Sequence, residues 1–171
     1  HIQSHPPALH HLLFRKKQTN FSNSIFLALV LLAFPAQAQI STNIVPDSTL
    51  PIPSLVTPID GTHTITKGTP VGPNLFHSFS DFQLGTGDAA KFTNPGGIEN
   101  ILSRVTGSNP SNLFGKLQSD STANLFFLNP NGVIFGPEAT WNVTGSFHVS
   151  TADFVQLGTG EGSGVFSATY P

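Results

Sequence analysis

Cysteine and methionine are absent from this 171-residue sequence, and charged residues make up only 9% of it. Without methionine, no initiator residue is visible at His1, so we expect either a fragment or a reading frame that starts upstream of the true start. The chain stops at Pro171 within strand-like sequence, and we expect the natural protein to continue. Scarce ionisable side chains leave little for a reaction centre, so we expect no catalytic residues, no bound metal and no cofactor.

The lack of cysteine excludes disulfides, which form readily in the oxidising compartments that exported proteins enter. Two explanations are compatible with this lack. A chain of this size with many phenylalanines can stabilise its core without cross-links, and a chain that must cross a second membrane unfolded cannot carry them. The absence alone does not choose between the two.

The pattern of the first 38 residues predicts a secretory signal peptide, together with an N-terminal extension that the signal does not explain. A basic cluster at residues 15–17 precedes an apolar run at residues 25–34, which is too short to span a bilayer as a helix. Ala36 and Ala38 are the small residues that a signal peptidase reads. We expect a helical signal, cleavage after Ala38 and a mature chain that begins at Gln39.

Acidic residues outnumber basic ones in the expected mature chain. All nine acidic residues follow residue 38, against four basic ones, which gives a formal charge of −5. Nucleic-acid binding and attachment to anionic lipid both need clustered lysine and arginine. The charge argues against both, whereas the signal predicts signal peptidase and the general export machinery as partners.

The mature chain reads as a series of short β-strands. Strand-like runs start roughly every 8–12 residues, and turn pairs such as Asn94-Pro95, Asn109-Pro110 and Asn131-Gly132 separate them. No sustained helical period follows the signal. The expected strands span residues 62–66, 75–84, 89–93, 100–106, 112–118, 123–128, 133–135, 140–143, 146–150, 154–157 and 165–169.

Three regions depart from simple alternation. Four prolines between residues 41 and 60 exclude a central strand, so composition favours a linker, with an extended edge or capping segment as the alternative. Residues 68–74 read as turn-rich. Phe79 and Phe82 lie too close for strict alternation, which indicates burial on both faces or a β-bulge.

This pattern predicts an all-β fold but leaves two architectures open, a sandwich or barrel and a solenoid. Asparagine and glycine suit the corners of a solenoid, because they adopt left-handed backbone conformations at low steric cost. Each coil buries its inward residues on its neighbours, and the ends need caps. Eleven phenylalanines between Phe76 and Phe166 supply apolar area for a core.

Few polar side chains suggest chemistry. His63, His77 and His148 are too scattered for a metal-binding motif, and we expect His77 to be packed or bonded in a turn. Asp81 and Asp88 could form a carboxylate pair like that of polysaccharide-cleaving β-helices. No basic residue is placed beside them for proton abstraction, so we expect surface exposure instead.

Seven motifs occur in order along the mature chain. They are Asp47-Ser48-Thr49-Leu50, Asn74-Leu75-Phe76-His77-Ser78-Phe79, Asn100-Ile101-Leu102-Ser103-Arg104-Val105-Thr106-Gly107, Ala123-Asn124-Leu125-Phe126, Asn129-Pro130-Asn131-Gly132, Phe135-Gly136-Pro137 and Gly145-Ser146-Phe147-His148-Val149-Ser150-Thr151-Ala152-Asp153. The ordered set resembles the secretion domain at the N-terminus of two-partner-secretion exoproteins, the filamentous-haemagglutinin type, and its wording resembles their large cyanobacterial group. It covers nearly all of residues 39–171. Val133 stands where the family motif has isoleucine, and a second motif, Asn-Pro-Asn-Leu, has no intact copy.

The resemblance implies a right-handed parallel β-helix with an N-terminal cap, and it makes residues 41–60 the first strand and cap. It implies recognition by an outer-membrane β-barrel transporter with periplasmic binding domains. The chain would then be secreted or surface-bound, via the periplasm and outer membrane of a Gram-negative-type bacterium. The domain would target an adhesin-like passenger for export and nucleate its β-helix. A β-helix protein that binds or cleaves polysaccharide, or an adhesin that acts through this domain, is the alternative.

The resemblance also nominates residues for transporter recognition or cap folding. The Asn-Pro-Asn-Gly motif has turn chemistry at every position, so we expect a corner turn that a transporter signal could overlap. Arg104 is the only arginine of the expected mature chain, and we expect it to hold a carboxylate or carbonyls at a corner, or to contact the transporter. The full set is Asn74, Phe76, His77, Phe79, Arg104, Asn129, Pro130, Asn131 and Gly132.

Overall fold

The structure is a computed structural model that describes residues 39–158 and 164–169. The predicted helical signal and its extension, residues 1–38, lie outside the described residues, as does the cleavage site at Ala36 and Ala38. Within the described ranges, no helix is long and apolar enough to cross a membrane. The regular elements there are β-strands, which confirms the all-β prediction.

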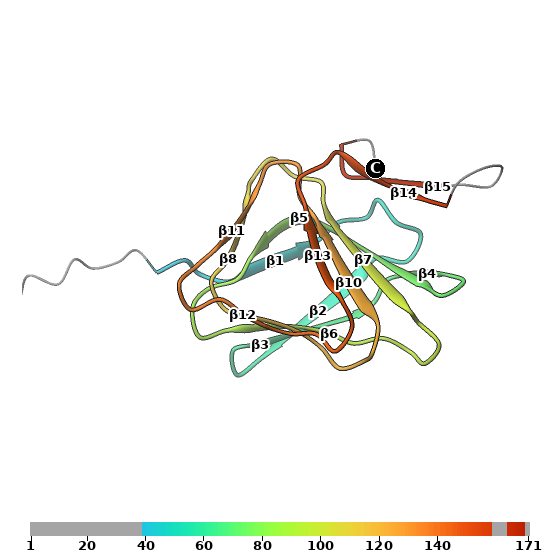
Figure 1. Ribbon diagram of the computed structural model, residues 1–171. Helices are drawn as coiled ribbons and strands as arrows, with labels where there is room; N and C mark the ends of the chain where they lie inside the picture. The colour runs from blue at the N-terminus through green and yellow to red at the C-terminus, as the bar shows by residue number, and fades with distance from the viewer. Residues whose placement is uncertain (1–38, 159–163, 170–171) are drawn as a thin grey trace, which may run out of the picture. The chain divides into compact units, whose positions relative to one another are not determined.

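The strands stack as a β-solenoid of about four turns, with three walls around a core (Figure 1). The first wall is parallel and consists of β5 (Asn74–Gln83), β7 (Asn100–Val105), β10 (Asn124–Leu128) and β13 (Phe147–Ser150). The second wall is parallel too and consists of β3 (Thr62–Lys67), β6 (Ala89–Phe92), β9 (Lys116–Ser119) and β12 (Thr140–Asn142). The third wall consists of β8 (Ser111–Leu113), β11 (Val133–Phe135) and a bridge from Leu84 to Leu113. This arrangement decides for the solenoid over the sandwich or barrel.

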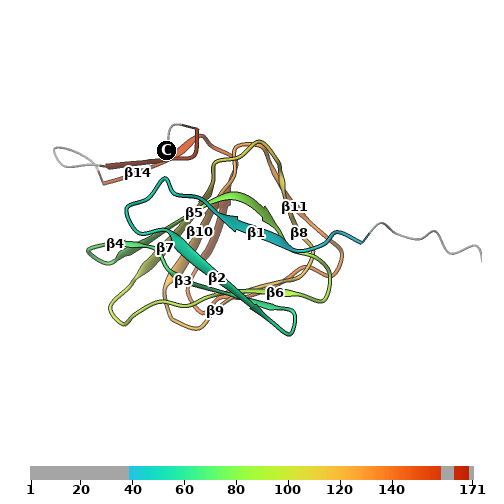
Figure 2. The ribbon, with the colours of Figure 1, turned by 180° about the vertical axis from the view of Figure 1, so that it is seen from behind.

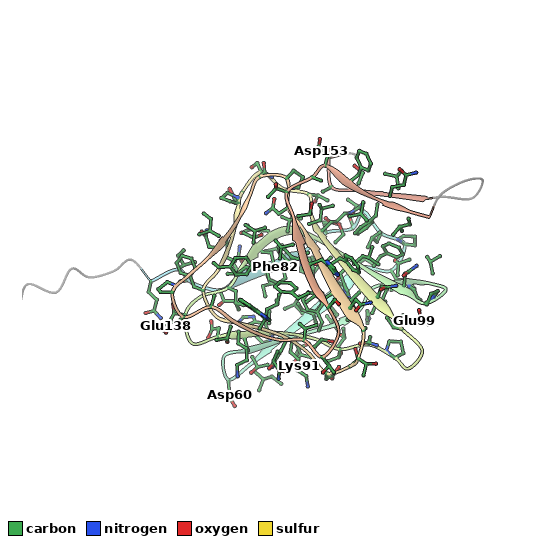
Figure 3. All side chains as sticks on the ribbon, in the orientation of Figure 1. Asp60, Phe82, Lys91, Glu99, Glu138 and Asp153 are labelled. Atoms are coloured by element: carbon green, nitrogen blue, oxygen red, sulfur yellow. The ribbon has the colours of Figure 1, made fainter. Side chains whose placement is uncertain are left out.

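The coils repeat in register, so equivalent side chains form columns. Asn74 pairs with Asn100, and Asn100 with Asn124, which gives repeats of 26 and 24 residues. The next residue of each strand points inward, and these leucine and isoleucine side chains are buried. Figure 3 shows Phe82 between the walls. Each coil therefore buries its apolar residues on its neighbours, as a solenoid requires.

The proline-rich segment is part of the fold, so the linker interpretation is wrong and the edge interpretation is confirmed. It forms β1 (Asn43–Pro46), antiparallel to β5, and β2 (Ser54–Ile59), antiparallel to β3. Figure 2 shows both strands from behind. Each lies at the edge of its sheet, where a proline that cannot donate is tolerated. The expected turn at residues 68–74 contains a third edge strand, β4 (Thr69–Val71), which pairs with β5.

Local chemistry explains how the cap begins. Asp60 and Gly61, with φ angles of 47° and 73°, form a two-residue turn between paired Ile59 and Thr62. Positive φ at both positions is the requirement of a type I′ hairpin, for which Asp-Gly is a preferred pair. The Asp60-Gly61 pair was not recognised as a hairpin signal, so residues 54–59 were expected only as part of an edge or capping segment and not as a strand paired with β3.

The predicted irregularity at Phe79 and Phe82 is confirmed as a β-bulge. Pairing between β1 and β5 shifts between Val45 and Pro46, which leaves Ser80 as an extra residue. The shift turns both phenylalanines into the core, where their rings meet edge to face at 5.1 Å. A bulge changes side-chain alternation in this way.

One expected strand, residues 112–118, is divided into β8 and β9 by a corner at Phe114 and Gly115. A Cβ on Gly115 would lie 2.3 Å from the carbonyl oxygen of Asp88 on the preceding coil. Only glycine fits such an approach. Gly115 is the single turn residue between these two strands, which was too weak a signal to predict a corner.

A hairpin lies outside the three walls. Its strands are β14 (Phe154–Leu157) and β15 (Gly164–Ser167), which pair antiparallel. Phe166 packs with Phe76 and Leu102 on the outer surface of the first wall and forms a second apolar cluster there. The first wall is thus covered on both faces at this point.

The last coil presents an aromatic layer, which we define as Phe135, Trp141 and Phe147. The register places them directly over the buried Leu113, Leu117 and Leu125. Their ring centroids lie 6.1 to 6.5 Å apart, and the Trp141 side chain is 59% exposed. The layer continues the inward-facing columns at an open end of the described coils.

Candidate recognition and cap-folding site

The nine nominated residues do not form one surface patch. Phe76 and Arg104 lie on the outer surface of the first wall, His77 and Phe79 lie in the core, and Asn74 begins β5. The Asn-Pro-Asn-Gly motif occupies the corner between β10 and β11. Asn131 alone among the nine is exposed.

Arg104 lies on β7 and is buried, with 4% of its surface exposed. Its Nε donates to Ser78 Oγ at 2.9 Å, and its Nη2 donates to Thr49 Oγ1 at 2.9 Å. Its Nη1 donates to the carbonyl oxygen of Ser167. Phe166 covers the guanidinium, with Cζ 4.6 Å from the ring centroid, in a cation–π geometry. The arginine therefore holds a carbonyl, one of the contacts expected from the sequence.

Asp47 faces Arg104 across shared hydroxyl groups. Its carboxylate accepts hydrogen bonds from Thr49 Oγ1 at 2.6 Å, Thr106 Oγ1 at 2.7 Å and Ser78 Oγ at 2.8 Å. The backbone N–H of Thr49 donates to it as well, at 3.0 Å. Thr49 and Ser78 each touch both charged groups, so the two charges are joined through hydroxyls.

The pKa values of Asp47 and Arg104 depend on their burial and on the groups that surround them. Burial by itself raises the pKa of Asp47, but the hydrogen bonds from Thr49, Thr106 and Ser78 together outweigh it and hold the pKa below its usual value. Burial lowers the pKa of Arg104, while the charge of Asp47 opposes that change. Arginine remains protonated in proteins, so the network holds one positive and one negative charge at neutral pH.

His77 is packed in the core, as expected. Its Nδ1 lies 2.9 Å from Ser54 Oγ, and its ring stacks with Phe79 and meets Phe92 edge to face. Its Nε2 has no hydrogen-bond partner among the described residues, and neither does Oγ of Ser103, its neighbour on β7. Burial lowers the pKa of His77 to about 4. The ring is therefore neutral at neutral pH and joins the cap strand β2 to the core.

The Asn-Pro-Asn-Gly motif forms the expected corner turn. The Gly132 N–H donates to the Asn129 carbonyl at 3.1 Å, which closes a four-residue turn with proline at its second position. The buried Asn129 side chain accepts from the Asn131 N–H and donates to Ser111 Oγ and to the carbonyl of Asn109. Asn129 thus ties this corner to the corner of the preceding coil.

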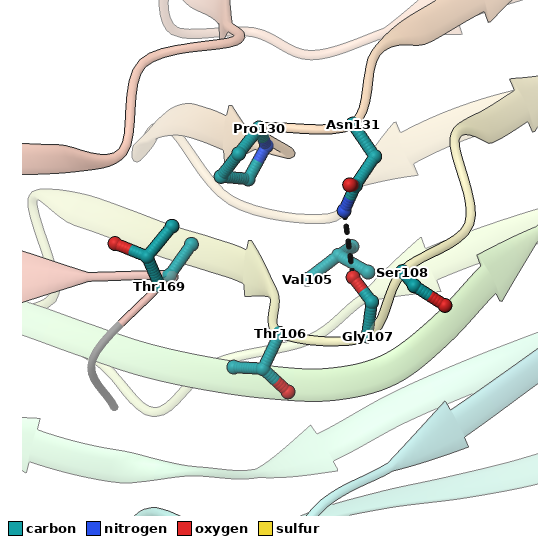
Figure 4. Close-up of a pocket in the computed structure, with 8 residues that line it drawn as sticks. Val105, Thr106, Gly107, Ser108, Pro130, Asn131 and Thr169 are labelled. Carbon is teal, nitrogen blue, oxygen red and sulfur yellow. Dashed lines mark hydrogen bonds between the residues drawn. The ribbon is translucent and has the colours of Figure 1, made fainter.

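A small cleft lies beside the two stacked corners (Figure 4). Its volume is about 230 Å³, and Pro130, Asn131, Gly107 and Thr169 are among its lining residues. Asn131 Nδ2 crosses it to donate to the Gly107 carbonyl at 2.7 Å. Asn131 is the part of the motif that a partner could reach in the folded domain.

Asn74 begins a ladder of asparagine side chains. Asn100 Nδ2 donates to Asn74 Oδ1 at 2.9 Å, and Asn124 Nδ2 donates to Asn100 Oδ1 at 3.0 Å. Asn124 Oδ1 then accepts from the Ser146 N–H. The ladder aligns the starts of four successive strands, because each asparagine side-chain oxygen accepts a hydrogen bond from the next coil.

Asp81 and Asp88 are half-buried at the surface, and each is hydrogen-bonded to a residue at or just before the start of β1, which the sequence did not predict. Asp81 accepts from Asn43 Nδ2 at 2.7 Å, and Asp88 accepts from Thr42 Oγ1 at 2.5 Å. His63 lies 3.9 Å from Asp88. Among the described residues there is no group of three or more histidine, cysteine and carboxylate side chains that could hold a metal ion.

Sequence reasoning missed most partners of the nominated residues. Asp47 and Thr49 lay within a quoted motif but were given no role, and Phe166 was counted only as core. The ladder had a readable signal, since Asn-Leu-Phe, Asn-Ile-Leu and Asn-Leu-Phe begin β5, β7 and β10. The contact between Ser167 and Arg104 had no readable signal in the sequence, because Ser167 accepts through its backbone carbonyl.

Comparison with known proteins adds two findings. The family described as the TPS secretion domain matches residues 42–169. A heme/hemopexin-binding protein of Haemophilus influenzae is 34% identical over 110 residues, which are 64% of this chain and 12% of that protein. The chain thus matches a small part of that relative's length.

Proposed function

The chain belongs to the TPS secretion-domain family, the non-catalytic targeting domains of exoproteins exported by two-partner secretion, and from this premise we propose how its residues serve export. Such exoproteins are secreted or surface-exposed in Gram-negative bacteria, and an outer-membrane transporter recognises their secretion domains. The proposal concerns the state in which the domain is recognised, the transporter's binding element and the cargo.

The transporter binds the domain in an extended form, before the coils stack. Burial of the nominated residues carries this proposal, since eight of the nine are covered to some degree in the folded domain. An extended segment exposes them, and its scarce charge keeps the desolvation cost of strand pairing low. At its N-terminal edges the folded domain is a poor template for strand addition, because Pro46, Pro58 and Pro70 lie on the edge strands β1, β2 and β4.

Periplasmic domains of a β-barrel transporter supply the receiving sheet edge in this proposal, after a signal peptidase has cleaved behind Ala38. The coils then stack outside the cell and oppose backsliding. The aromatic layer supports a nucleating role, because a further coil would cover its exposed rings.

The cargo is adhesin-like in this proposal, and the cyanobacterial grouping remains a prediction. The relative named for heme/hemopexin binding makes a cargo of that kind the second candidate. A polysaccharide-cleaving β-helix is less favoured, since Asp81 is hydrogen-bonded to Asn43 on β1 and Asp88 to Thr42 just before it.

Export with and without the partner transporter tests the proposal. The gene, with its natural start and natural domain end, is expressed in both conditions, and the protein is measured in medium, periplasm and cells. We expect it outside only with the transporter. Release without the transporter contradicts the proposal, and so does retention of a folded periplasmic product in both conditions.

Variants separate direct recognition from folding. Asn131→Ala removes the exposed side chain of the motif, and Ser108→Ala alters an exposed residue at the neighbouring corner as a matched control. If the extended motif is read directly, Asn131→Ala lowers export although the purified variant refolds normally. Normal export of a variant that refolds normally contradicts direct reading of Asn131.

A further inference from the structure

Arg104 contacts segments that lie far apart in the sequence. Thr49 precedes it by 55 residues and Ser167 follows it by 63. We name residues 47–50 the strap and β14 with β15 the hairpin. We propose that Arg104 couples the docking of the strap to the docking of the hairpin, so that the N-terminal cap closes firmly only when the hairpin is in place.

The burial of Arg104 supplies the physical reason. Its guanidinium donates to the strap through Thr49 and to the hairpin through Ser167, while Phe166 covers its face. The first segment to dock must order this long side chain and remove water from it. The second then docks on an arginine that is already ordered, which gives positive cooperativity.

Asp47 makes the coupling reciprocal. It receives hydroxyl hydrogen bonds from Thr49, Ser78 and Thr106, and Thr49 and Ser78 also accept from Arg104. Hydrogen bonds from hydroxyls to charged groups strengthen when water is excluded. Loss of Phe166 would admit water to the guanidinium and weaken the strap contacts, although no hydrogen bond joins Phe166 to the strap among those described.

Apolar packing offers a second route between the same segments. Leu50 of the strap packs against the cluster of Phe76, Leu102 and Phe166. A test must therefore separate a signal through Arg104 from one through Leu50.

The coupling has a consequence for timing that rests on the proposed function. Thr49 and Ser167 are more than one hundred residues apart, so a chain exported from its N-terminus presents the strap long before the hairpin. The strap would stay loosely held until the hairpin follows, and the cap would lock late. The coupling itself is a property of the folded chain and does not depend on a transporter.

Hydrogen exchange on the purified, refolded full chain tests the coupling. Phe166→Ala should raise exchange at the amides of Asp47 and Thr49 by about fivefold or more, as expected when members of one network are coupled. Thr49→Val should raise exchange at the Ala168 amide, which bonds Asp153 at the base of the hairpin. Val133→Ala, which alters the main core instead, is the matched control and should not single out either segment.

Arg104→Lys separates the two routes, because lysine keeps the charge but cannot reach three partners with a planar fork. Thr49→Val and Phe166→Ala are made singly and together, both in the wild-type chain and in Arg104→Lys. We expect their effects on the free energy of unfolding to be non-additive where residue 104 is arginine and additive where it is lysine. Additivity with Arg104, or strap amides unaffected by Phe166→Ala, overturns the proposal. If the effects are still non-additive in Arg104→Lys, the coupling runs through Leu50, and this result also overturns the role of Arg104. No transporter takes part, so this result is independent of the export test.

Discussion

Acid should weaken this domain through His77, a buried ring that packs against Phe79 and Phe92. The pKa is about 4 in the folded chain, against 6.5 for an ordinary histidine. The unfolded chain therefore binds more protons between these values, so stability is full above pH 6.5 and falls as the pH drops toward 4. Each pKa unit corresponds to about 1.36 kcal/mol, so the loss from this group approaches about 3 kcal/mol.

Urea unfolding at several pH values between 7 and 4 measures the effect on the full chain. A loss of about 3 kcal/mol is a large share of the roughly 5–15 kcal/mol that stabilises a domain. His77→Phe removes the titrating group and keeps an aromatic ring beside Phe79 and Phe92, so its stability should depend much less on pH in this range. His148→Gln alters an exposed histidine and should keep the wild-type dependence.

Two outcomes would refute this reasoning. One is a wild-type free energy of unfolding that stays constant from pH 7 to 4. The other is an undiminished loss in His77→Phe, which would place the titration elsewhere. Asp47, whose pKa is lowered, adds its own loss only at lower pH, as its carboxylate protonates.

Two further predictions concern the corners. Asn129→Ala should lower the free energy of unfolding by about 2–3 kcal/mol in urea titrations, since it leaves buried groups unpaired, whereas Asn131→Ala should cost about 1 kcal/mol or less; equal losses would contradict this assignment. Gly107→Ala should prevent normal folding, as judged by circular dichroism and hydrogen exchange, because its Cβ would lie 2.0 Å from the carbonyl oxygen of Ser80. Gly96→Ala, with open space around it, should fold normally, and a stable Gly107→Ala would refute the steric argument.

The sequence predicted strands best where a turn residue bounded each apolar run. Residues 133–135 and 154–157 were predicted with the bounds that β11 and β14 have. Residues 112–118 were not divided, because Gly115 is needed for a close backbone approach that only the neighbouring coil reveals. Proline-rich β1 and β2 were visible as edge segments, but composition could not show which strands they pair with.

The candidate site was less predictable, because its contacts join distant segments. The turn chemistry of Asn129 is local and could be read directly. The contacts of Arg104 with Thr49 and Ser167 depend on how coils and hairpin come together, and one of its acceptors is a carbonyl without a residue signature. The hydrogen bonds of Asp81 and Asp88 were missed for the same reason, since their partners Asn43 and Thr42 lie about forty residues away in the sequence.

The aromatic layer gives this chain an optical reporter of its own. Trp141 is its single tryptophan, and it stands at the open end of the described coils. Its emission in this setting should be red-shifted and readily quenched by iodide. Anything that comes to cover that end would shift the emission to the blue and shield it from quencher, so growth of the solenoid past this coil can be followed in real time without a label.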